Sequence, residues 1–480
     1  MTPTKTLYFH GLNLLFSLLA GVILYGWLTA DPGLHVIKRL TDEDAEAMAR
    51  KAAESGKVLI EGYFQAFHDG PATRESGTWT GFRGDRMDNI AAFGGALNAS
   101  WGNTGPGQLW SVPLGEGHGG AAVYEGLVYM LDYDEERNGD ALRCFTLDTG
   151  EEIWRRWYEA PTKRNHGRSR TVPSVNQDVI VTMGPRGFVQ GVDRATGEFL
   201  WGLDLVKDYG TEIPHWYTAQ CPLIHDGVAV IAPAGKDIML MGVDAKSGET
   251  IWETPNPMKW KMSHASLILT RFQGKLMYVY QAIGGVVGIS AEADDRGTLL
   301  WSTGEWRPSV AAPSPIAIDE RRLFLTAGYG AGSCMLEIVK DGESWQANVL
   351  EVWEKTHFAC EQQTPIFWKD HLFSVLPKDA GANRAQFICM DLEGNIVWQS
   401  GKEHRYGLGP YILVGGYFFI LDDNGMLSMI EASTKAFKLI AEHRVLEGRD
   451  AWGPMAFVDG KLLLRDSTLL ACLDMTRSQK

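Results

Sequence analysis

Apolar and polar positions follow one repeating pattern along residues 141–475. Each unit contains a segment of the form apolar-x-apolar-Asp-x-x-Thr-Gly-Glu-x-apolar-Trp, and the units recur about every 40–50 residues, a period typical of arrays and propellers. The clearest copies read LRCFTLDTGEEIW, VQGVDRATGEFLW and LMGVDAKSGETIW. They end at Trp154, Trp201 and Trp252; weaker copies end at Trp301, Trp353 and Trp398, and two copies without the tryptophan occupy 427–440 and 469–475.

A second marker gives the same count of units. In each unit a short polar turn separates two runs rich in Val, Ile, Leu, Tyr and Phe, as in AAVYEGLVYML and GKLMYVY. Alternating apolar runs joined in this way predict a β-hairpin. Both markers count eight units, and each unit has room for about four strands, the content of one propeller blade. The turns lie at Glu125-Gly126, Gln177-Asp178, Asp226-Gly227, Gln273-Gly274, Asp319-Glu320, Lys369-Asp370, Gly415-Gly416 and Asp459-Gly460.

The incomplete last unit has a partner at the start of the repeat region. Residues 109–114 read LWSVPL, and Trp110 stands where a blade-closing tryptophan is expected. The last blade would take its outer strand from this segment and its inner strands from 452–475, which closes the ring and protects its edges. We therefore predict an all-β, eight-bladed β-propeller of four-stranded blades over 79–478. Its blade-closing tryptophans, packed between neighbouring blades, are Trp110, Trp154, Trp201, Trp252, Trp301, Trp353 and Trp398.

These repeats resemble the pyrroloquinoline-quinone (PQQ) type propeller repeat. That family includes quinoprotein dehydrogenases and the propeller lipoprotein of outer-membrane protein assembly, BamB. The resemblance covers roughly residues 79–475, and the leader WTGFRGDRMDN (79–89) is similar to membrane-linked bacterial propellers of this group. It implies an eight-bladed fold and a periplasmic or otherwise extracytoplasmic location. It does not imply a function, because the same scaffold serves catalysts and pure binders.

Composition excludes several classes of function. A chain of 480 residues suffices for one large all-β domain with an extension, and its net charge of −14 argues against a nucleic-acid partner. The sequence has no Gly-rich phosphate loop before a helix, no His-Glu-x-x-His and no Cys-x-x-Cys-His, so covalent haem is excluded. Six cysteines are spread over six blades, and those at 144, 334, 389 and 472 fall on expected strand positions. We interpret all six as small buried core residues: Cys144, Cys221, Cys334, Cys360, Cys389 and Cys472.

The N-terminus predicts a membrane segment. After a short tail (1–7), residues 8–30 are mostly apolar and long enough to span a bilayer. A cleaved signal peptide competes with a transmembrane helix, or uncleaved signal anchor, but only Lys5 is basic before the core and Leu28 stands where cleavage favours a small residue. No cysteine lies nearby, so the lipid anchor of the BamB lipoprotein is not available. The flanking charges favour a cytoplasmic domain, whereas the family resemblance implies a periplasmic one, which we prefer.

Residues 31–78 are expected to connect this segment to the propeller. The stretch 41–55, TDEDAEAMARKAAES, predicts a helical stalk with Thr41 as its N-cap. The stretch 57–78 mixes short apolar runs with Gly, Pro and Ser, and it predicts a loosely packed linker.

Candidate binding residues gather in the eight loops that precede the innermost strands, because in a propeller these loops converge on one mouth of the central channel. The arginines of this set would exceed the nearby carboxylates and would favour an anionic ligand, bound by bidentate contacts. The alternative is that the polar side chains pair with one another and line a water-filled channel. The set comprises His118, Arg168, Arg170, Tyr217, Gln220, His264, Glu361, Gln362, Gln363, Arg405, Tyr406, Arg449, Asp450 and Trp452.

Three functions remain open at this stage. The first is a membrane-anchored, non-catalytic propeller that acts as a protein-interaction scaffold, with 337–353 as a candidate contact loop and other membrane or periplasmic proteins as partners. The second is a PQQ-dependent quinoprotein dehydrogenase. The resemblance implies that such an enzyme would bring an adjacent Cys-Cys pair and a Ca²⁺ site, and neither has a match here. The third is a sensor of small anions at the channel mouth. We favour the scaffold, with no catalytic residue, no metal and no cofactor.

Overall fold

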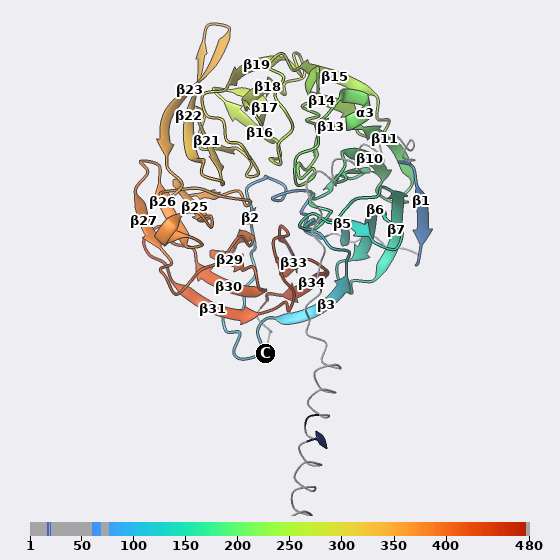
Figure 1. Ribbon diagram of the computed structural model, residues 1–480, viewed down its shortest axis with the longest axis vertical. Coiled ribbons are helices and arrows are strands. Elements are labelled where there is room, and N and C mark those ends of the chain that lie inside the picture. Colours follow the sequence, from blue (N-terminus) through green and yellow to red (C-terminus); the bar gives the residue numbers. More distant parts are fainter. Residues whose placement is uncertain (1–16, 19, 21–59, 69–75, 477–480) are drawn as a thin grey trace, which may run out of the picture. The chain divides into compact units, whose positions relative to one another are not determined.

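The computed structural model describes residues 17–18, 20, 60–68 and 76–476. The described residues 60–68 and 76–476 form a ring of eight sheets around a central axis (Figure 1). Each blade has four antiparallel strands, and the sheets of the first and seventh blades each gain a fifth strand from the N-terminal side of the ring. The first strands β32, β4, β8 and β12 of four consecutive blades contact one another in turn. The predicted all-β, eight-bladed propeller is confirmed.

The first four blades follow the chain without interruption, each from its inner to its outer strand. Their bounds are β4 Ala121–Tyr124, β5 Leu127–Asp134, β6 Gly139–Thr146 and β7 Glu152–Glu159; β8 Ser174–Val175, β9 Val179–Met183, β10 Phe188–Asp193 and β11 Phe199–Asp204; β12 Leu223–His225, β13 Val228–Ile231, β14 Ile238–Asp244 and β15 Thr250–Pro255; β16 Ile268–Phe272, β17 Lys275–Ala282, β18 Gly285–Ser290 and β19 Leu299–Thr303.

The remaining blades continue in the same way, and the eighth takes its outer strand, β3, from the beginning of the ring. In that blade Trp110 lies opposite Cys472, as the sequence predicts. The bounds are β20 Ile316–Ala317, β21 Arg322–Ala327, β22 Gly332–Asp341 and β23 Ser344–Trp353; β24 Ile366–Trp368, β25 His371–Val375, β26 Phe387–Asp391 and β27 Ile396–Gln399; β28 Tyr411–Val414, β29 Tyr417–Leu421, β30 Met426–Glu431 and β31 Leu439–Arg444; β32 Ala456–Val458, β33 Lys461–Arg465, β34 Leu469–Asp474 and β3 Gly107–Pro113.

The eight predicted turns all join the first and second strands of a blade. Glu125 and Gly126 both have positive φ, 47° and 78°, as a two-residue type I′ hairpin requires. The blade-closing tryptophans lie on the outer strands, and all are buried except Trp353, which is half-buried. All six cysteines are buried and form no disulfide, which confirms their interpretation as core residues. The expected spread over six blades is wrong, because Cys360 precedes β24 and Cys389 lies on β26 of the same sixth blade.

The leader segment 76–91 lies inside the ring rather than before it. Trp79 pairs with Val123 of β4, and β2 (Ile90–Ala91) runs parallel to β28 of the seventh blade. The Gly77 N–H donates to the carboxylate of Asp459 in a hairpin turn, so the segment enters at the end of the channel where these turns lie. Figure 1 shows the segment crossing the centre of the ring.

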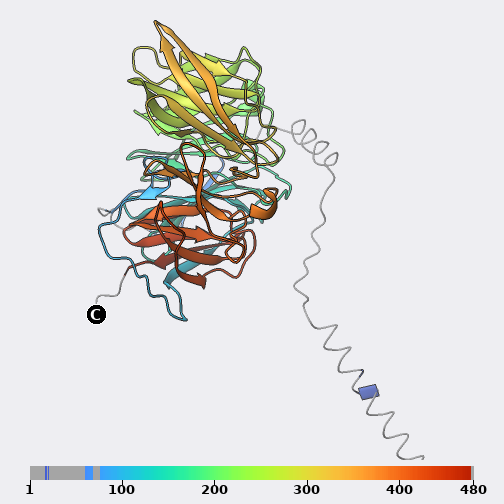
Figure 2. The ribbon, with the colours of Figure 1, turned by 90° about the vertical axis from the view of Figure 1, so that its left-hand side faces the viewer.

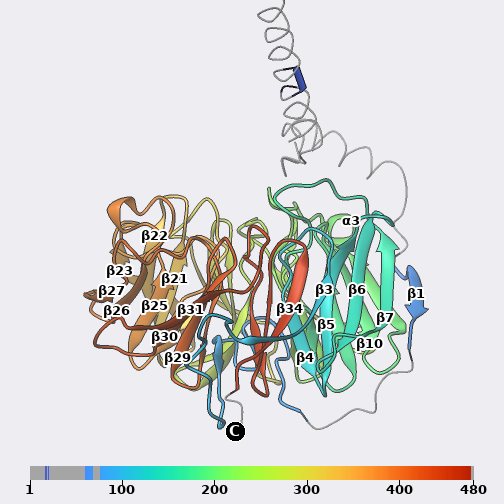
Figure 3. The ribbon, with the colours of Figure 1, turned by 90° about the horizontal axis from the view of Figure 1, so that it is seen from below.

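A second segment adds a strand to the rim. Strand β1 (Tyr63–Ala66) pairs antiparallel with β7, so the first blade has five strands (Figures 1 and 3). The Tyr63 ring stacks on Trp157 with centroids 5.7 Å apart, and the Phe64 ring packs on Trp154 at 6.1 Å. Within the expected linker 57–78, the exposed residues Tyr63–Ala66 thus form an edge strand, which the sequence did not indicate.

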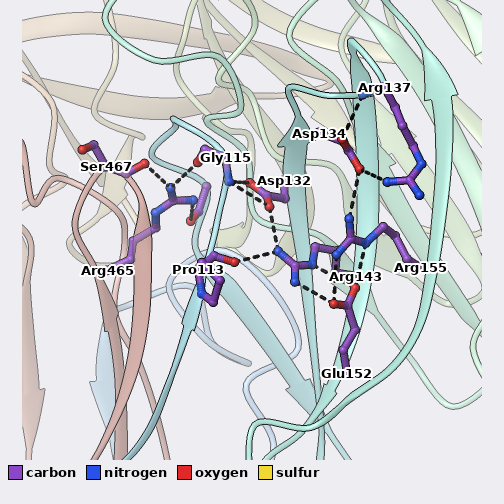
Figure 4. Close-up of polar contacts among 11 residues, drawn as sticks. Pro113, Gly115, Asp132, Asp134, Arg137, Arg143, Glu152, Arg155, Arg465 and Ser467 are labelled. Carbon is purple, nitrogen blue, oxygen red and sulfur yellow. Dashed lines mark hydrogen bonds and ion pairs between the residues drawn. The ribbon is translucent and has the colours of Figure 1, made fainter. Parts of the chain in front are cut away.

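The ring closure carries a chain of charged side chains (Figure 4). Arg143 bridges Asp132 at 3.0 Å and Glu152 at 2.6 Å, and Arg155 continues the chain from Glu152 to Asp134. Burial raises the pKa of Asp132, and the charges of Arg465 and Arg143 act against that rise. The contacts join strands of the first blade to the loop that leads in from β3, since Asp132 also accepts from the Gly115 N–H at 3.0 Å.

Helices are few in the described part of the chain. They are α3 (Leu205–Tyr209), which Asp204 caps by accepting from the Lys207 N–H, and the short 3₁₀ turn η1 (Gly381–Asn383). Among the residues described, no helix has the length and apolar character needed to cross a membrane. The predicted membrane segment 8–30 lies outside the described residues except for 17, 18 and 20, and the stalk helix 41–55 lies entirely outside them.

Candidate functional site

One cavity of about 230 Å³ lies at the channel mouth, where the loops before the innermost strands converge. Phe82 belongs to its lining, so the leader segment that crosses the centre of the ring also contributes to this cavity. The lining comprises Phe82, His118, His166, Arg170, Trp216, Ala219, Cys221, His264, Ser266, Val310, Ala312, Tyr329, Glu361, Gln362, Gln363, Lys378, Leu408, Trp452 and Pro454.

Aromatic rings form two parts of the cavity wall. Trp216 stacks on Tyr329 with centroids 5.4 Å apart and an interplanar angle of 22°, and it also contacts the ring of His264 at 5.9 Å. Trp452 packs against His118 at 5.1 Å, and its Nε1–H donates to Asp423 over 2.7 Å. Because Trp452 is held by both contacts, its ring is fixed before any ligand arrives.

Arg170 brings a positive charge to this wall. Its Nη2 donates to the carbonyl oxygens of Asn165 at 2.6 Å and His166 at 2.9 Å, which fixes the plane of the guanidinium. Its Nε is buried and has no hydrogen-bond partner, and no carboxylate among the described residues lies within ion-pair distance of it. Burial lowers the pKa of Arg170 to about 10, so the group stays charged at neutral pH.

Two histidines stand beside this arginine as neutral groups. Burial, followed by the charge of Arg170, lowers the pKa of His118 to about 3 and that of His264 to about 4. His118 Nε2 donates to the His166 carbonyl over 2.8 Å, which leaves its Nδ1 as a buried acceptor without a partner. Neither ring nitrogen of His264 has a partner within the described structure, so it keeps one free N–H donor and one free acceptor.

The only carboxylate in the lining of this cavity is Glu361. Burial raises the pKa of this carboxyl above its usual value, and the charge of Lys378 acts against that rise. Gln363 donates from Nε2 to the Trp452 carbonyl over 3.1 Å, and the Lys378 ammonium lies 5.5 Å from the centre of the Trp452 ring.

The structure brings together part of the predicted set. His118, Arg170, His264, Glu361, Gln362, Gln363 and Trp452 line the cavity. The predicted cluster of four arginines is corrected: Arg168 pairs with Glu135 at 2.7 Å and lies over Tyr133, Arg405 donates to the carbonyls of Ala382 and Arg384, and Arg449 does not reach the lining. The guanidiniums of Arg168 and Arg405 thus bond to acceptors on neighbouring loops.

Four other candidates are also placed away from the cavity. Tyr217 donates from its hydroxyl to the Lys163 carbonyl at 2.8 Å. Gln220 is fully buried, where its amide both donates to and accepts from the backbone of Ala232. Tyr406 is buried in the core, and Asp450 does not belong to the lining. Gln220 and Tyr406 thus hold the blades together.

Sequence reasoning missed two kinds of lining residue. Tyr329 and Lys378 lie in the loops between the second and third strands of the fifth and sixth blades. Since the second strand runs antiparallel to the first, these loops lie at the same end of the ring, and that rule could have identified them. Phe82 comes from the leader, whose path through the channel no repeat pattern indicates.

The lining does not fit PQQ bound with Ca²⁺. Calcium takes six to eight oxygen ligands, whereas the lining of this cavity offers one carboxylate and includes the cations Arg170 and Lys378. Among the described residues, no group of three or more His, Cys, Asp or Glu side chains is disposed to hold a metal ion.

Comparisons place the chain among known proteins. The family model described as outer membrane protein assembly factor BamB matches residues 94–213 and 137–400. A comparison with curated proteins gives no match. The structure is similar to BamB from Moraxella catarrhalis, at 13% identity and a TM-score of 0.51, covering 76% of this chain and 99% of that one. It is also similar to the quinohemoprotein alcohol dehydrogenase of Comamonas testosteroni, at 11% identity and a TM-score of 0.57, covering 84% and 81%.

At these identities the two solved structures establish a shared fold and nothing more. The family model reaches further, because its two matches together span residues 94–400, more than half of the 480 residues. Each match covers at least two blades, so it rests on the repeated strand and turn pattern and not on one motif. The chain therefore belongs to the propeller family described as outer membrane protein assembly factor BamB.

Proposed function

We propose that this chain is an extracytoplasmic propeller that binds other proteins in a membrane-linked assembly and catalyses no reaction itself. The observation that carries this proposal is the family match, whose description names outer membrane protein assembly. A propeller suits such a role because it offers wide faces and exposed strand edges to partners.

The rim of the ring supplies a candidate contact surface. The hairpin of β22 and β23 has ten residues in each strand and projects from the fifth blade (Figures 1 and 2). Leu350 and Val352 on β23 are 47% and 52% exposed, and Trp345 near its tip is half-buried. The pairing of β1 with β7 supports a docking mode by strand addition, since one outer edge of this ring already accepts a further strand.

Co-purification from membranes tests the scaffold role. The full chain, tagged and cross-linked in cells, should recover a reproducible set of partner proteins. The double variant Leu350→Glu and Val352→Glu should lose most of that set, because charges on an apolar contact surface oppose docking. Ile251→Glu is the matched control: Ile251 is 53% exposed and precedes Trp252 as Val352 precedes Trp353. A partner set unchanged in the double variant would remove the hairpin from the proposal.

The membrane link is proposed to run through residues 8–30. The protein should stay with membranes after high-salt and carbonate washes, and a reporter fused to its C-terminus should be active outside the cytoplasm. Release in soluble form with a mature N-terminus at Asp31 or later would contradict the anchor.

A PQQ-dependent dehydrogenase is the alternative, and the fold shared with the quinohemoprotein alcohol dehydrogenase is its basis. Visible absorbance of the purified protein, with and without added PQQ and Ca²⁺, distinguishes the two functions. The spectrum of a bound quinone, together with reduction of a dye when an alcohol is added, would show that the protein is a dehydrogenase and not a non-catalytic scaffold.

A further inference from the structure

Unpartnered polar atoms gather at the cavity of the channel mouth. Arg170 Nε, both ring nitrogens of His264 and His118 Nδ1 are buried without a hydrogen-bond partner in the described structure. All three residues line this one cavity. Buried polar groups in native proteins are almost always bonded, so a cluster of such atoms around one space indicates a partner that enters it.

The charge at this point calls for an anion. The guanidinium of Arg170 is held in place by the carbonyls of Asn165 and His166, and it has no ion-pair partner within the described chain. A buried cation without a counter-ion is costly, and an entering anion offsets that cost. The other charged groups of the lining are Glu361, Lys378 and, when protonated, His166. Of these, only Glu361 opposes an anion.

The walls select the rest of the ligand. Trp216, stacked on Tyr329, and Trp452, packed on His118, present ring surfaces to the cavity, and Phe82 adds a third. Such surfaces favour a flat apolar body. One guanidinium edge and one neutral imidazole N–H match the two oxygens of a planar carboxylate better than the three or more oxygens of a phosphate.

We propose that this cavity binds a carboxylate attached to a flat apolar group, with the carboxylate on Arg170 and His264 and the flat group against Trp216 and Trp452. This site is separate from the rim contacts of the proposed scaffold function. Two sources share the chemistry: a free aromatic acid, and the C-terminal carboxylate of a protein that ends in an aromatic residue. If the ligand is the C-terminal carboxylate of a partner protein, the cavity takes part in the assembly. If the ligand is a free aromatic acid, the cavity acts as a sensor.

Ligand-observed NMR and calorimetric titration of the full chain in mild detergent test the proposal. The probes are phenylacetate for the free acid and N-acetyl-phenylalanine for a peptide C-terminus, each compared with its uncharged amide. We expect one or both acids to bind, and their amides to bind at least about tenfold more weakly, the usual contribution of a charge-assisted pair. Preference for the first or the second acid identifies the source. Equal binding of acids and amides, or binding of neither acid, would overturn the proposal.

Variants locate the site. Arg170→Met should weaken acid binding by about tenfold or more. Arg170→Lys should weaken it by less, because an ammonium keeps the charge but cannot form the bidentate hydrogen bonds of a guanidinium. Arg168→Met is the matched control, since Arg168 lies two residues away on the same loop and pairs with Glu135 outside the lining. Should Arg170→Met fail to fold, as shown by its circular dichroism, His264→Phe replaces it and should weaken acid binding in the same direction. Full binding by a folded Arg170→Met or His264→Phe protein would place the carboxylate elsewhere.

Discussion

The indole of Trp201, on the outer strand of the second blade, rests on Gly248 in a turn of the third blade. Trp201 Nε1 donates to the Ala245 carbonyl over 2.8 Å, and a Cβ at Gly248 would lie 2.4 Å from Trp201 Cγ. The tryptophan and the glycine of the repeated motif therefore form a single contact between consecutive blades. The same packing of a tryptophan ring on a glycine of the next blade joins Trp110 to Gly150, Trp154 to Gly197, Trp252 to Gly297 and Trp353 to Gly394.

Gly248→Ala should destabilise the ring through this contact. The φ of Gly248, +72°, already disfavours residues other than glycine, and the added methyl would displace the Trp201 ring from its packed position. We expect a loss of about 2–4 kcal/mol in denaturant unfolding. Gly274→Ala is the control, because Gly274 has a φ of +80° but nothing lies within 4 Å of its Cβ position. It should lose only about 1 kcal/mol from backbone strain. Equal losses would show that strain alone matters.

The indole N–H adds a separable part to the same contact. Replacing Trp201, Trp154 or Trp252 with Ala should cost about 3–5 kcal/mol, as for other buried aromatics. Trp201→Phe should cost about 1 kcal/mol more than Trp252→Phe, because Trp201 loses its bond to Ala245 whereas Trp252 Nε1 has no partner in the described structure. Chemical unfolding of both variants measures the difference. Equal losses would mean that the Trp201 hydrogen bond contributes nothing net.

The repeat made the fold predictable because its chemistry is local. A positive φ at Glu125 and Gly126 follows from the turn residues themselves, and the seat of Trp201 on Gly248 follows from the motif. Segment 60–68 was not predictable. Its pairing with β7 depends on contacts between side chains far apart in sequence, such as Tyr63 on Trp157. No periodic pattern in the sequence predicts such contacts.

The sequence predicted where the cavity lies but not which side chains line it. The propeller topology places the loops of His118, Arg170 and Trp452 at one mouth of the channel, and all three residues line the cavity. The sequence could not tell Arg170 from Arg168, since two residues on one loop differ only in the acceptors within reach. Arg168 finds the Glu135 carboxylate, whereas Arg170 finds carbonyls and keeps an unpaired Nε.

Asp140 should make stability depend on pH. It is fully buried, accepts from the Tyr158 hydroxyl at 2.8 Å, and has its other oxygen unpaired in the described structure. Burial raises the pKa of Asp140 to about 7, while Tyr158 and the charge of Arg186 oppose the rise. Because the folded pKa exceeds the unfolded one, this carboxyl costs stability as pH rises from about 4 to about 7, and the cost persists above that.

The variant Asp140→Asn isolates that cost. Asn keeps an acceptor for Tyr158 and cannot ionise, so the stability of the variant relative to the wild type should rise by about 2–4 kcal/mol between pH 4 and pH 8. Unfolding midpoints at the two pH values measure the change. Glu343→Gln, at an exposed position in the β22–β23 turn, should show no such pH dependence. A variant that gains nothing at pH 8 would mean that Asp140 ionises without penalty.

Arg465 should be the most sensitive residue of the ring closure. Its side chain is fully buried, and its guanidinium donates to the carbonyls of Gly115 and Gly119, on the segment that enters the first blade, and of Asp466 and Ser467 in the eighth (Figure 4). Arg465→Met leaves those buried carbonyls without a donor, so we expect a loss of about 3–5 kcal/mol. Arg465→Lys should recover part of it, because an ammonium reaches fewer of the four acceptors.

The loss should also depend on pH, because the charge of Arg465 restrains the pKa of Asp132. Without Arg465 that pKa rises further above its unfolded value. The variant should then lose stability more steeply than the wild type as pH rises from about 4 to about 8, by roughly 1 kcal/mol. Adding Asp132→Asn to Arg465→Met should abolish this extra pH dependence while the loss at pH 5 remains. Parallel pH profiles of stability for Arg465→Met and the wild type would assign the whole effect of Arg465 to its hydrogen bonds with the carbonyls. The interaction of its charge with Asp132 would then contribute nothing to stability.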